Sequence, residues 1–178
     1  MSGLPGSGKT TLGRGIAAAL GVPLLDKDEI LEPLLETLAT ADPDSRQRLS
    51  RASDAVLQSI AMNTPAAVLC SFWRRERLST TSGTPTDWLR DLQDARLVEV
   101  YCACSVPLAV QRFQARRRHP GHHDGRHTTE DLIDQFTRLD AEGPLGIGVL
   151  IRADTGGDVD PAAIAAVVVR HLGKRVKG

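Results

Sequence analysis

The sequence is poor in cysteine, carries no net charge and has no long hydrophobic run. Three cysteines, an odd number without a signal-peptide pattern, argue against a disulfide framework and for a reducing cytoplasm. The 22 basic residues are balanced by 22 acidic ones, so the basic excess of a general nucleic-acid binder is missing. The longest apolar run, Ala162 to Val169, is too short to span a bilayer. Membrane and nucleic-acid partners are therefore not expected.

What the chain does have is enough apolar sequence for one domain over residues 1–178, since 41% of its residues are hydrophobic. Short apolar runs alternate with amphipathic stretches, which predicts an α/β fold with a parallel sheet between helices. The three cysteines lie in such runs and are interpreted as small buried residues. The expected strands are 22–26, 66–72, 97–103 and 147–153. Expected helices are 10–20, 29–40 with Pro33 bending it or delaying its start, about 43–62, a short one opened by Thr84-Pro85, 105–118, one capped by Thr128 and Asp131, and 161–173.

The strongest motif lies at the N-terminus, where residues 3–10 read GLPGSGKT and fit G-x-x-x-x-G-K-[ST] without a mismatch. Such a loop directs backbone N–H groups at phosphate oxygens, Lys9 supplies a charge for the β and γ phosphates, and the Thr10 hydroxyl can hold Mg²⁺. We therefore expect ATP and Mg²⁺ as cofactors. The residues expected at the nucleotide are Gly3, Gly6, Ser7, Gly8, Lys9, Thr10 and Thr11.

Two large classes of nucleotide-binding proteins are disfavoured. GTPases need an Asn/Thr-Lys-x-Asp motif to read the base, and the chain has none. Motor ATPases need an apolar strand that ends in Asp-Glu, whereas the candidate strands here run into 70–73 (CSFW) and 102–105 (CACS). Both classes therefore lose weight.

Four further motifs occur, at 24–28 (LLDKD), 71–74 (SFWR), 112–122 and Asp154-Thr155. Together with the phosphate loop, they resemble the small P-loop kinases that phosphorylate metabolites, antibiotics or polynucleotide ends, a group often catalogued as AAA-family ATPases. The resemblance implies a three-layer P-loop NTPase fold with strand order 2-3-1-4-5. It also implies transfer of the γ-phosphoryl group of ATP to a hydroxyl of a small-molecule acceptor, whose identity stays open, as does the oligomeric state.

Asp26 and Asp28 are two residues apart, so on an extended strand end they would project to one side. The resemblance implies that Asp28 accepts the proton of the attacking hydroxyl, while Asp26 holds Mg²⁺ through water. The alternative for Asp28 is a helix cap near Glu29.

Arg112 and Arg116 are spaced to share one helix face, and the resemblance implies an arginine lid over about 112–128. Arg116 is the preferred catalytic arginine and Arg112 a nucleotide contact, against the alternative of a solvated helix face. Asp154, after the last strand, is a further expected nucleotide contact.

Two other features leave alternatives open. Trp73 and Arg74 are candidates for lining the acceptor site. For Trp73, the alternative is that it packs in the core. The histidines His119, His122, His123 and His127 fit a lid better than a zinc site.

The strand that precedes the phosphate loop in this family is apparently missing, because only Met1 and Ser2 stand before Gly3. We therefore expect a natural chain with further N-terminal residues that supply an apolar strand.

Shikimate kinase shares the GKT and Asp-x-Asp patterns, but it expects a triple-glycine turn where 71–74 reads SFWR, so it is rejected as the specific assignment. Two alternatives to a metabolite kinase remain: a non-catalytic ATP-binding or ATPase module, and a toxin-like or polynucleotide kinase.

Overall fold

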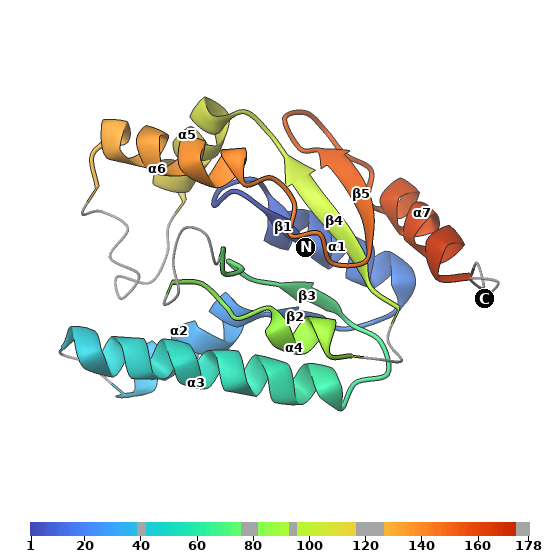
Figure 1. The fold of residues 1–178 in the computed structure, drawn as a ribbon, viewed down its shortest axis with the longest axis horizontal. Coiled ribbons are helices and arrows are strands. Elements are labelled where there is room, and N and C mark those ends of the chain that lie inside the picture. The colour runs from blue at the N-terminus through green and yellow to red at the C-terminus, as the bar shows by residue number, and fades with distance from the viewer. Residues whose placement is uncertain (39–41, 76–81, 93–95, 117–126, 174–178) are drawn as a thin grey trace.

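The computed structural model describes residues 1–38, 42–75, 82–92, 96–116 and 127–173. Its elements alternate along the chain as the sequence predicts (Figure 1). In chain order they are β1 (Ser2–Gly3), α1 (Lys9–Leu20), β2 (Leu24–Asp26), α2 (Lys27–Leu38), α3 (Pro43–Met62), β3 (Val68–Cys70), α4 (Asp87–Arg90), β4 (Val98–Ala103), α5 (Val106–Ala115), α6 (Thr129–Ala141), β5 (Val149–Asp154) and α7 (Pro161–Gly173).

All strand pairs are parallel, which confirms the predicted fold class. β1 pairs with β4, β4 with β5, and β2 with β3. Each of these pairs belongs to the order 2-3-1-4-5. In the part of the chain that the structure describes, β1 and β3 form no ladder, and the Met1 ammonium joins them by donating to the Leu69 carbonyl at 2.7 Å.

The first strand is present, contrary to the expectation that it is missing. Ser2 and Gly3 lie opposite Tyr101 and Cys102 of β4. These two residues pair directly with β4, whose middle four residues are buried, and continue into Leu4, which is itself buried. The phosphate loop therefore starts from the sheet.

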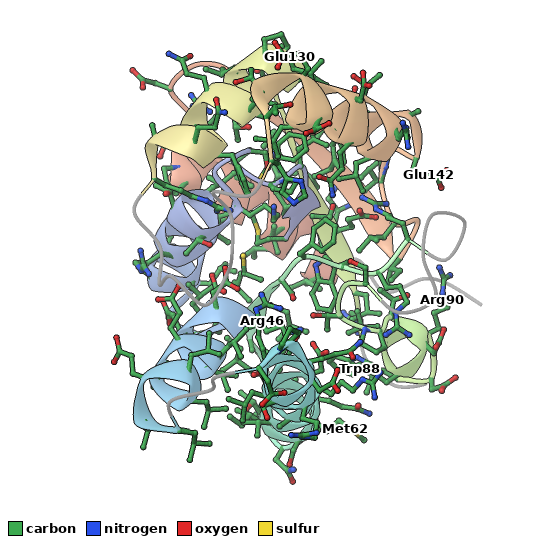
Figure 2. All side chains as sticks on the ribbon, turned by 90° about the vertical axis from the view of Figure 1, so that its left-hand side faces the viewer. Arg46, Met62, Trp88, Arg90, Glu130 and Glu142 are labelled. Atoms are coloured by element: carbon green, nitrogen blue, oxygen red, sulfur yellow. The ribbon has the colours of Figure 1, made fainter. Side chains whose placement is uncertain are left out.

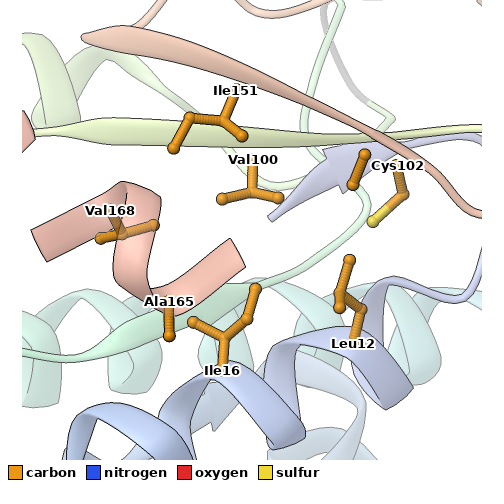
Figure 3. Packing of buried hydrophobic residues seen from close by; sticks show 8 residues of the cluster. Leu12, Ile16, Val100, Cys102, Ile151, Ala165 and Val168 are labelled. Carbon is orange, nitrogen blue, oxygen red and sulfur yellow. The ribbon is translucent and has the colours of Figure 1, made fainter. Parts of the chain in front are cut away.

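β4 is buried on both faces and shows how the layers are built. Val100 and Cys102 point to one face, where they pack with Leu12 and Ile16 of α1 and with side chains of β5 and α7 (Figure 3). The alternate residues point the other way. Tyr101 donates from its hydroxyl to Asp140 of α6 at 3.3 Å. The sheet thus lies between helices, as the three-layer fold requires.

Two smaller clusters hold the remaining helices. Leu4 packs with α5 and α6 above the phosphate loop. Leu57 of α3, Leu89 of α4 and Trp73 form the other cluster, next to β2 and β3. Figure 1 shows α2, α3 and α4 together on the β2 and β3 side of the molecule.

Most helix boundaries follow the predicted signals. The Asp42 side chain caps α3 by accepting from the Ser45 N–H at 2.8 Å, and Thr128 and Asp131 form a capping box on α6. Two boundaries differ from expectation: Pro33 does not delay the start of its helix, since α2 starts at Lys27, and α5 ends at Ala115 instead of near residue 118.

The cysteines are free, with Cys70 and Cys102 buried and Cys104 half-buried. Among the described residues, no helix combines the length and apolarity needed to cross a membrane.

Candidate active site

A cleft of about 870 Å³ opens beside the phosphate loop, and its walls come from β2, α2, α3, α5, α6 and the segment after β5. A volume of this size suits a nucleotide-sized ligand. Gly8 ends the loop with φ of 84° and lines the cleft, and no atom lies within 4 Å of the place where a side chain would start. Glycine adopts this conformation without strain, whereas a side chain at this position would be disfavoured.

Lys9 reaches across the loop instead of into solvent. Its ammonium donates to the carbonyl oxygens of Gly3 at 3.1 Å and Leu4 at 2.7 Å. Burial is the main cause that lowers the pKa of Lys9, and the nearby Arg116 lowers it further. An anion bound in the loop would offset both effects, which is the environment that a phosphate-binding lysine needs.

Ser7 is the second polar side chain of the loop, and its hydroxyl oxygen is buried. Within the described residues, this oxygen has no hydrogen-bond partner. Buried hydroxyls are nearly always paired, so an unpaired one in the phosphate loop is unusual, although Ser7 itself does not line the cleft.

Thr10 and Asp26 come together, as expected of the two residues assigned to Mg²⁺. The Thr10 hydroxyl donates to Asp26 Oδ2 at 2.7 Å, and Cys70 Sγ lies 3.5 Å from the same hydroxyl. Burial raises the pKa of Asp26, partly offset by the hydrogen bond from Thr10. A hydroxyl and a buried carboxylate are oxygen donors of the kind that Mg²⁺ selects, so these residues fit the ion.

Asp26 and Asp28 differ from the expected arrangement, because Asp26 ends β2 whereas Asp28 lies in the first turn of α2. Asp26 Oδ1 accepts from the Asp28 N–H at 3.0 Å. The carboxylate that caps α2 is thus Asp26, and this answers the alternative that assigned the cap to Asp28. Both residues line the cleft.

The two predicted lid arginines do not share a helix face, since Arg116 follows the end of α5 in an extended conformation. Both nevertheless line the cleft. Arg112 donates to the Thr155 carbonyl at 2.7 Å, and the Arg116 guanidinium lies 4.6 Å from the Phe113 ring centre. The lid beyond Arg116, residues 117–126, lies outside the described residues.

Asp154 does not line the cleft, although its neighbours do. Its Oδ1 accepts from the Gly156 N–H at 2.9 Å, so it supports the turn that follows β5. Thr155 and Gly157 are the residues of this turn that reach the cleft.

Trp73 is a core residue, 5% exposed, whose indole N–H donates to the Met1 carbonyl at 2.7 Å. Neither Trp73 nor Arg74 lines the cleft. Of the clustered histidines, His127 lines it, whereas His119, His122 and His123 lie outside the described residues. No group of three metal-ligating side chains occurs in the described ranges.

Sequence reasoning missed the far wall of the cleft, which carries Lys27, Arg46, Ser50, Phe72 and Gly83. Figure 2 shows Arg46 on the side of α3 that faces the body of the molecule. Lys27 and Phe72 lie within the motifs at 24–28 and 71–74, but the motifs gave them no role of their own. Arg46, Ser50 and Gly83 belong to no motif, because α3 and the segment after β3 meet α2 only in three dimensions. Side chains alternate in direction along an extended segment, so a buried Trp73 implies that Phe72 points the other way. This was the one signal that could have identified Phe72 as a residue of the cleft.

Replacing Asp26 with asparagine should leave the ligand-free protein at least as stable near neutral pH. Burial raises the pKa of Asp26, so the folded state binds its proton more tightly than the unfolded chain, and this carboxyl favours folding less as the pH rises between the two pKa values. Asparagine removes that dependence and keeps an acceptor oxygen. Thermal unfolding with ATP and a Mg²⁺ titration should show that ATP alone still stabilises the variant, while the gain from Mg²⁺ is lost. A Mg²⁺ response equal to that of the wild type would contradict the assignment.

Replacing Lys9 with alanine should weaken ATP binding by roughly 1.5–3 kcal/mol, because one charge-assisted contact to phosphate is removed. Lys9→Arg should weaken ATP binding as well, since a planar guanidinium does not fit the place of a compact ammonium in a tight loop. Titration of a fluorescent ATP analogue measures both.

Arg14→Ala is the matched control, because Arg14 lies on the same helix and its exposed ion pair with Glu29 is outside the cleft. Wild-type affinity in a folded Lys9→Ala variant would mean that the loop does not hold phosphate.

Known proteins share both sequence and fold with this chain. A shikimate kinase from Mycobacterium avium (strain 104) is 42% identical over 62 residues, 32% of this chain and 34% of that protein. The similarity thus spans about a third of the length of such relatives. A candidate kinase from Chloroflexus aurantiacus has the same fold with a TM-score of 0.71 and 24% identity, covering 94% of this chain and 91% of that one. A gluconokinase from Sinorhizobium meliloti 1021 has a TM-score of 0.54 and 23% identity, covering 96% and 92%.

The AAA domain family AAA_33 matches residues 1–139, which include the phosphate loop, the Asp26 and Asp28 pair and both arginines. Because this match covers most of the chain and the fold agrees, the protein belongs to the AAA_33 family of AAA domains.

Proposed function

We propose that this protein is an ATP-dependent phosphotransferase that moves the γ-phosphoryl group of ATP to a hydroxyl of a small molecule. The observation that carries the proposal is the position of Asp28, which lines the same cleft as Lys9 and Thr10 without serving as the cap of α2. A carboxylate in this position can accept a proton from an attacking hydroxyl. The kinase names of the similar proteins support the same class of reaction.

The residues that line the cleft fall into three roles: phosphate binding, Mg²⁺ binding and proton transfer. Lys9 and the backbone of Gly8, which line the cleft, bind phosphate oxygens, and Arg116 adds positive charge near Lys9. Thr10 and Asp26 would hold Mg²⁺, which neutralises charge on the phosphates. Asp28 orients the acceptor hydroxyl and takes its proton as the new O–P bond forms and the bond to the β-phosphate oxygen breaks.

The remaining parts of the proposal concern the context of the reaction. We propose that residues 1–178 form one catalytic unit, with Arg112 and Arg116 at the base of the lid. The acceptor is a small molecule, since the chain has no net charge with which to follow a nucleic-acid strand. A cytoplasmic location agrees with its free cysteines.

The test is transfer of radioactive phosphate from γ-labelled ATP, with Mg²⁺, to a panel of sugars, sugar acids, nucleosides and hydroxylated antibiotics. We expect a labelled phosphate ester from at least one class, and none from Lys9→Ala. Release of inorganic phosphate with no labelled ester from any class would contradict a kinase and favour the ATPase module.

A further inference from the structure

The backbone after β3 is extended and held in place. Trp73 forms a parallel bridge with Thr84, in which the Thr84 N–H donates to the Phe72 carbonyl and the Arg74 N–H donates to the Thr84 carbonyl, both at 2.8 Å. The Ser71 and Thr84 hydroxyls lie 2.5 Å apart. These contacts fix Phe72 from both sides, although it lies outside the named strands.

Alternation along this segment sends Phe72 and Trp73 to opposite sides. Trp73 enters the core, whereas Phe72 is 37% exposed and lines the cleft. The Phe, Trp and Tyr side chains all lie in the described ranges, and only Phe72 among them is exposed. An aromatic ring on a rigid backbone loses little freedom when a ligand packs against it, which makes it suitable as a binding surface.

Phe72 is also tied to the element that carries Asp28. The Thr84 hydroxyl donates to Asp54 Oδ1 of α3 at 2.7 Å, and Lys27 forms an ion pair with the same oxygen at 2.6 Å. Lys27 precedes Asp28 in the first turn of α2 and also donates to the Ser50 hydroxyl at 3.1 Å. This half-buried network therefore links the aromatic ring and the carboxylate across three elements.

We propose that Phe72 determines acceptor specificity and selects alcohols that carry a flat aromatic ring. The ring of the acceptor packs on Phe72 while its hydroxyl reaches Asp28, and Arg46 and Ser50 of the same wall face its polar groups. This inference rests on the proposed function, because the ligand is taken to be the phosphoryl acceptor. Its test measures binding and needs no phosphoryl transfer.

The test measures binding without transfer, with the site saturated by Mg²⁺ and a non-hydrolysable ATP analogue. Titration calorimetry compares matched probes that differ in the ring: phenyl β-D-glucopyranoside against methyl β-D-glucopyranoside, adenosine against D-ribose, and 2-phenylethanol against ethanol. In at least one pair, we expect the aromatic member to bind about tenfold tighter or better. The inference is overturned if no pair shows this preference.

Variants at Phe72 then assign the preference to this side chain. Phe72→Tyr should keep it and Phe72→Ala should lose it, while Phe72→Leu should keep only the part due to apolar contact. Val169→Ala is the control, because Val169 is exposed on α7 and outside the cleft. A preference that survives in Phe72→Ala would place the ring elsewhere. Failure of the labelled-phosphate test would leave these binding results standing, so the two proposals fail separately.

Discussion

Replacing Asp28 with asparagine should slow phosphoryl transfer by roughly 10²- to 10⁴-fold, the usual contribution of a positioned general base. The amide keeps the size of the carboxylate but cannot take the proton of the acceptor hydroxyl. Affinity for ATP should change little, because Lys9 and Gly8 line the cleft at the phosphate loop and Asp26 caps α2. Single-turnover transfer from labelled ATP measures the rate, and a fluorescent ATP analogue measures the affinity.

Asp134→Asn is the matched control for Asp28→Asn, since Asp134 is exposed on α6 and does not line the cleft. Its transfer rate should equal that of the wild type. If Asp28→Asn also transfers at the wild-type rate, the proton leaves by another route and Asp28 is not the base.

Replacing Glu99 with alanine should lower the free energy of unfolding more than any other replacement proposed for this protein. Glu99 lies on β4, is 5% exposed, and accepts from the N–H groups of Leu145 at 2.7 Å, Gly146 at 2.9 Å and Ile147 at 3.4 Å. It also accepts from the buried Ser2 hydroxyl at 2.5 Å. Ser2 and Ile147 are buried and Leu145 is half-buried, whereas Gly146 is exposed. Each buried donor left without an acceptor costs about 1–3 kcal/mol. The expected total is several kcal/mol, a large part of the roughly 5–15 kcal/mol that stabilises a typical domain.

Urea unfolding of Glu99→Ala tests this expectation. Glu130→Ala is the control, because Glu130 is exposed at the start of α6 (Figure 2), and its replacement should change the free energy of unfolding by no more than about 0.5 kcal/mol. A loss in Glu99→Ala as small as that of the control would mean that water reaches the three N–H groups and replaces the carboxylate.

Short-range signals were sufficient for the fold class and for the phosphate loop. The alternation of apolar runs and amphipathic stretches predicted the parallel sheet, and residues 3–10 predicted the loop before α1. Caps such as Asp42 and Thr128 act within three residues, so they too can be recognised in the sequence. The loop motif and the family resemblance assigned Thr10 and Asp26 to Mg²⁺, and the structure places the two side chains in contact.

The tertiary structure alone decided which carboxylate caps α2, where Arg116 lies and which side of 71–74 faces the cleft. Capping by Asp26 depends on where β2 stops and α2 starts, a boundary that a pattern of hydrophobic residues leaves open by several positions. Glu99, Phe72 and Lys27 take their roles from partners distant in the sequence: the loop at 145–147, Thr84 and Asp54. Local propensities carry no information about such contacts, because they form only when the packing of the sheet and its helices brings separate segments together.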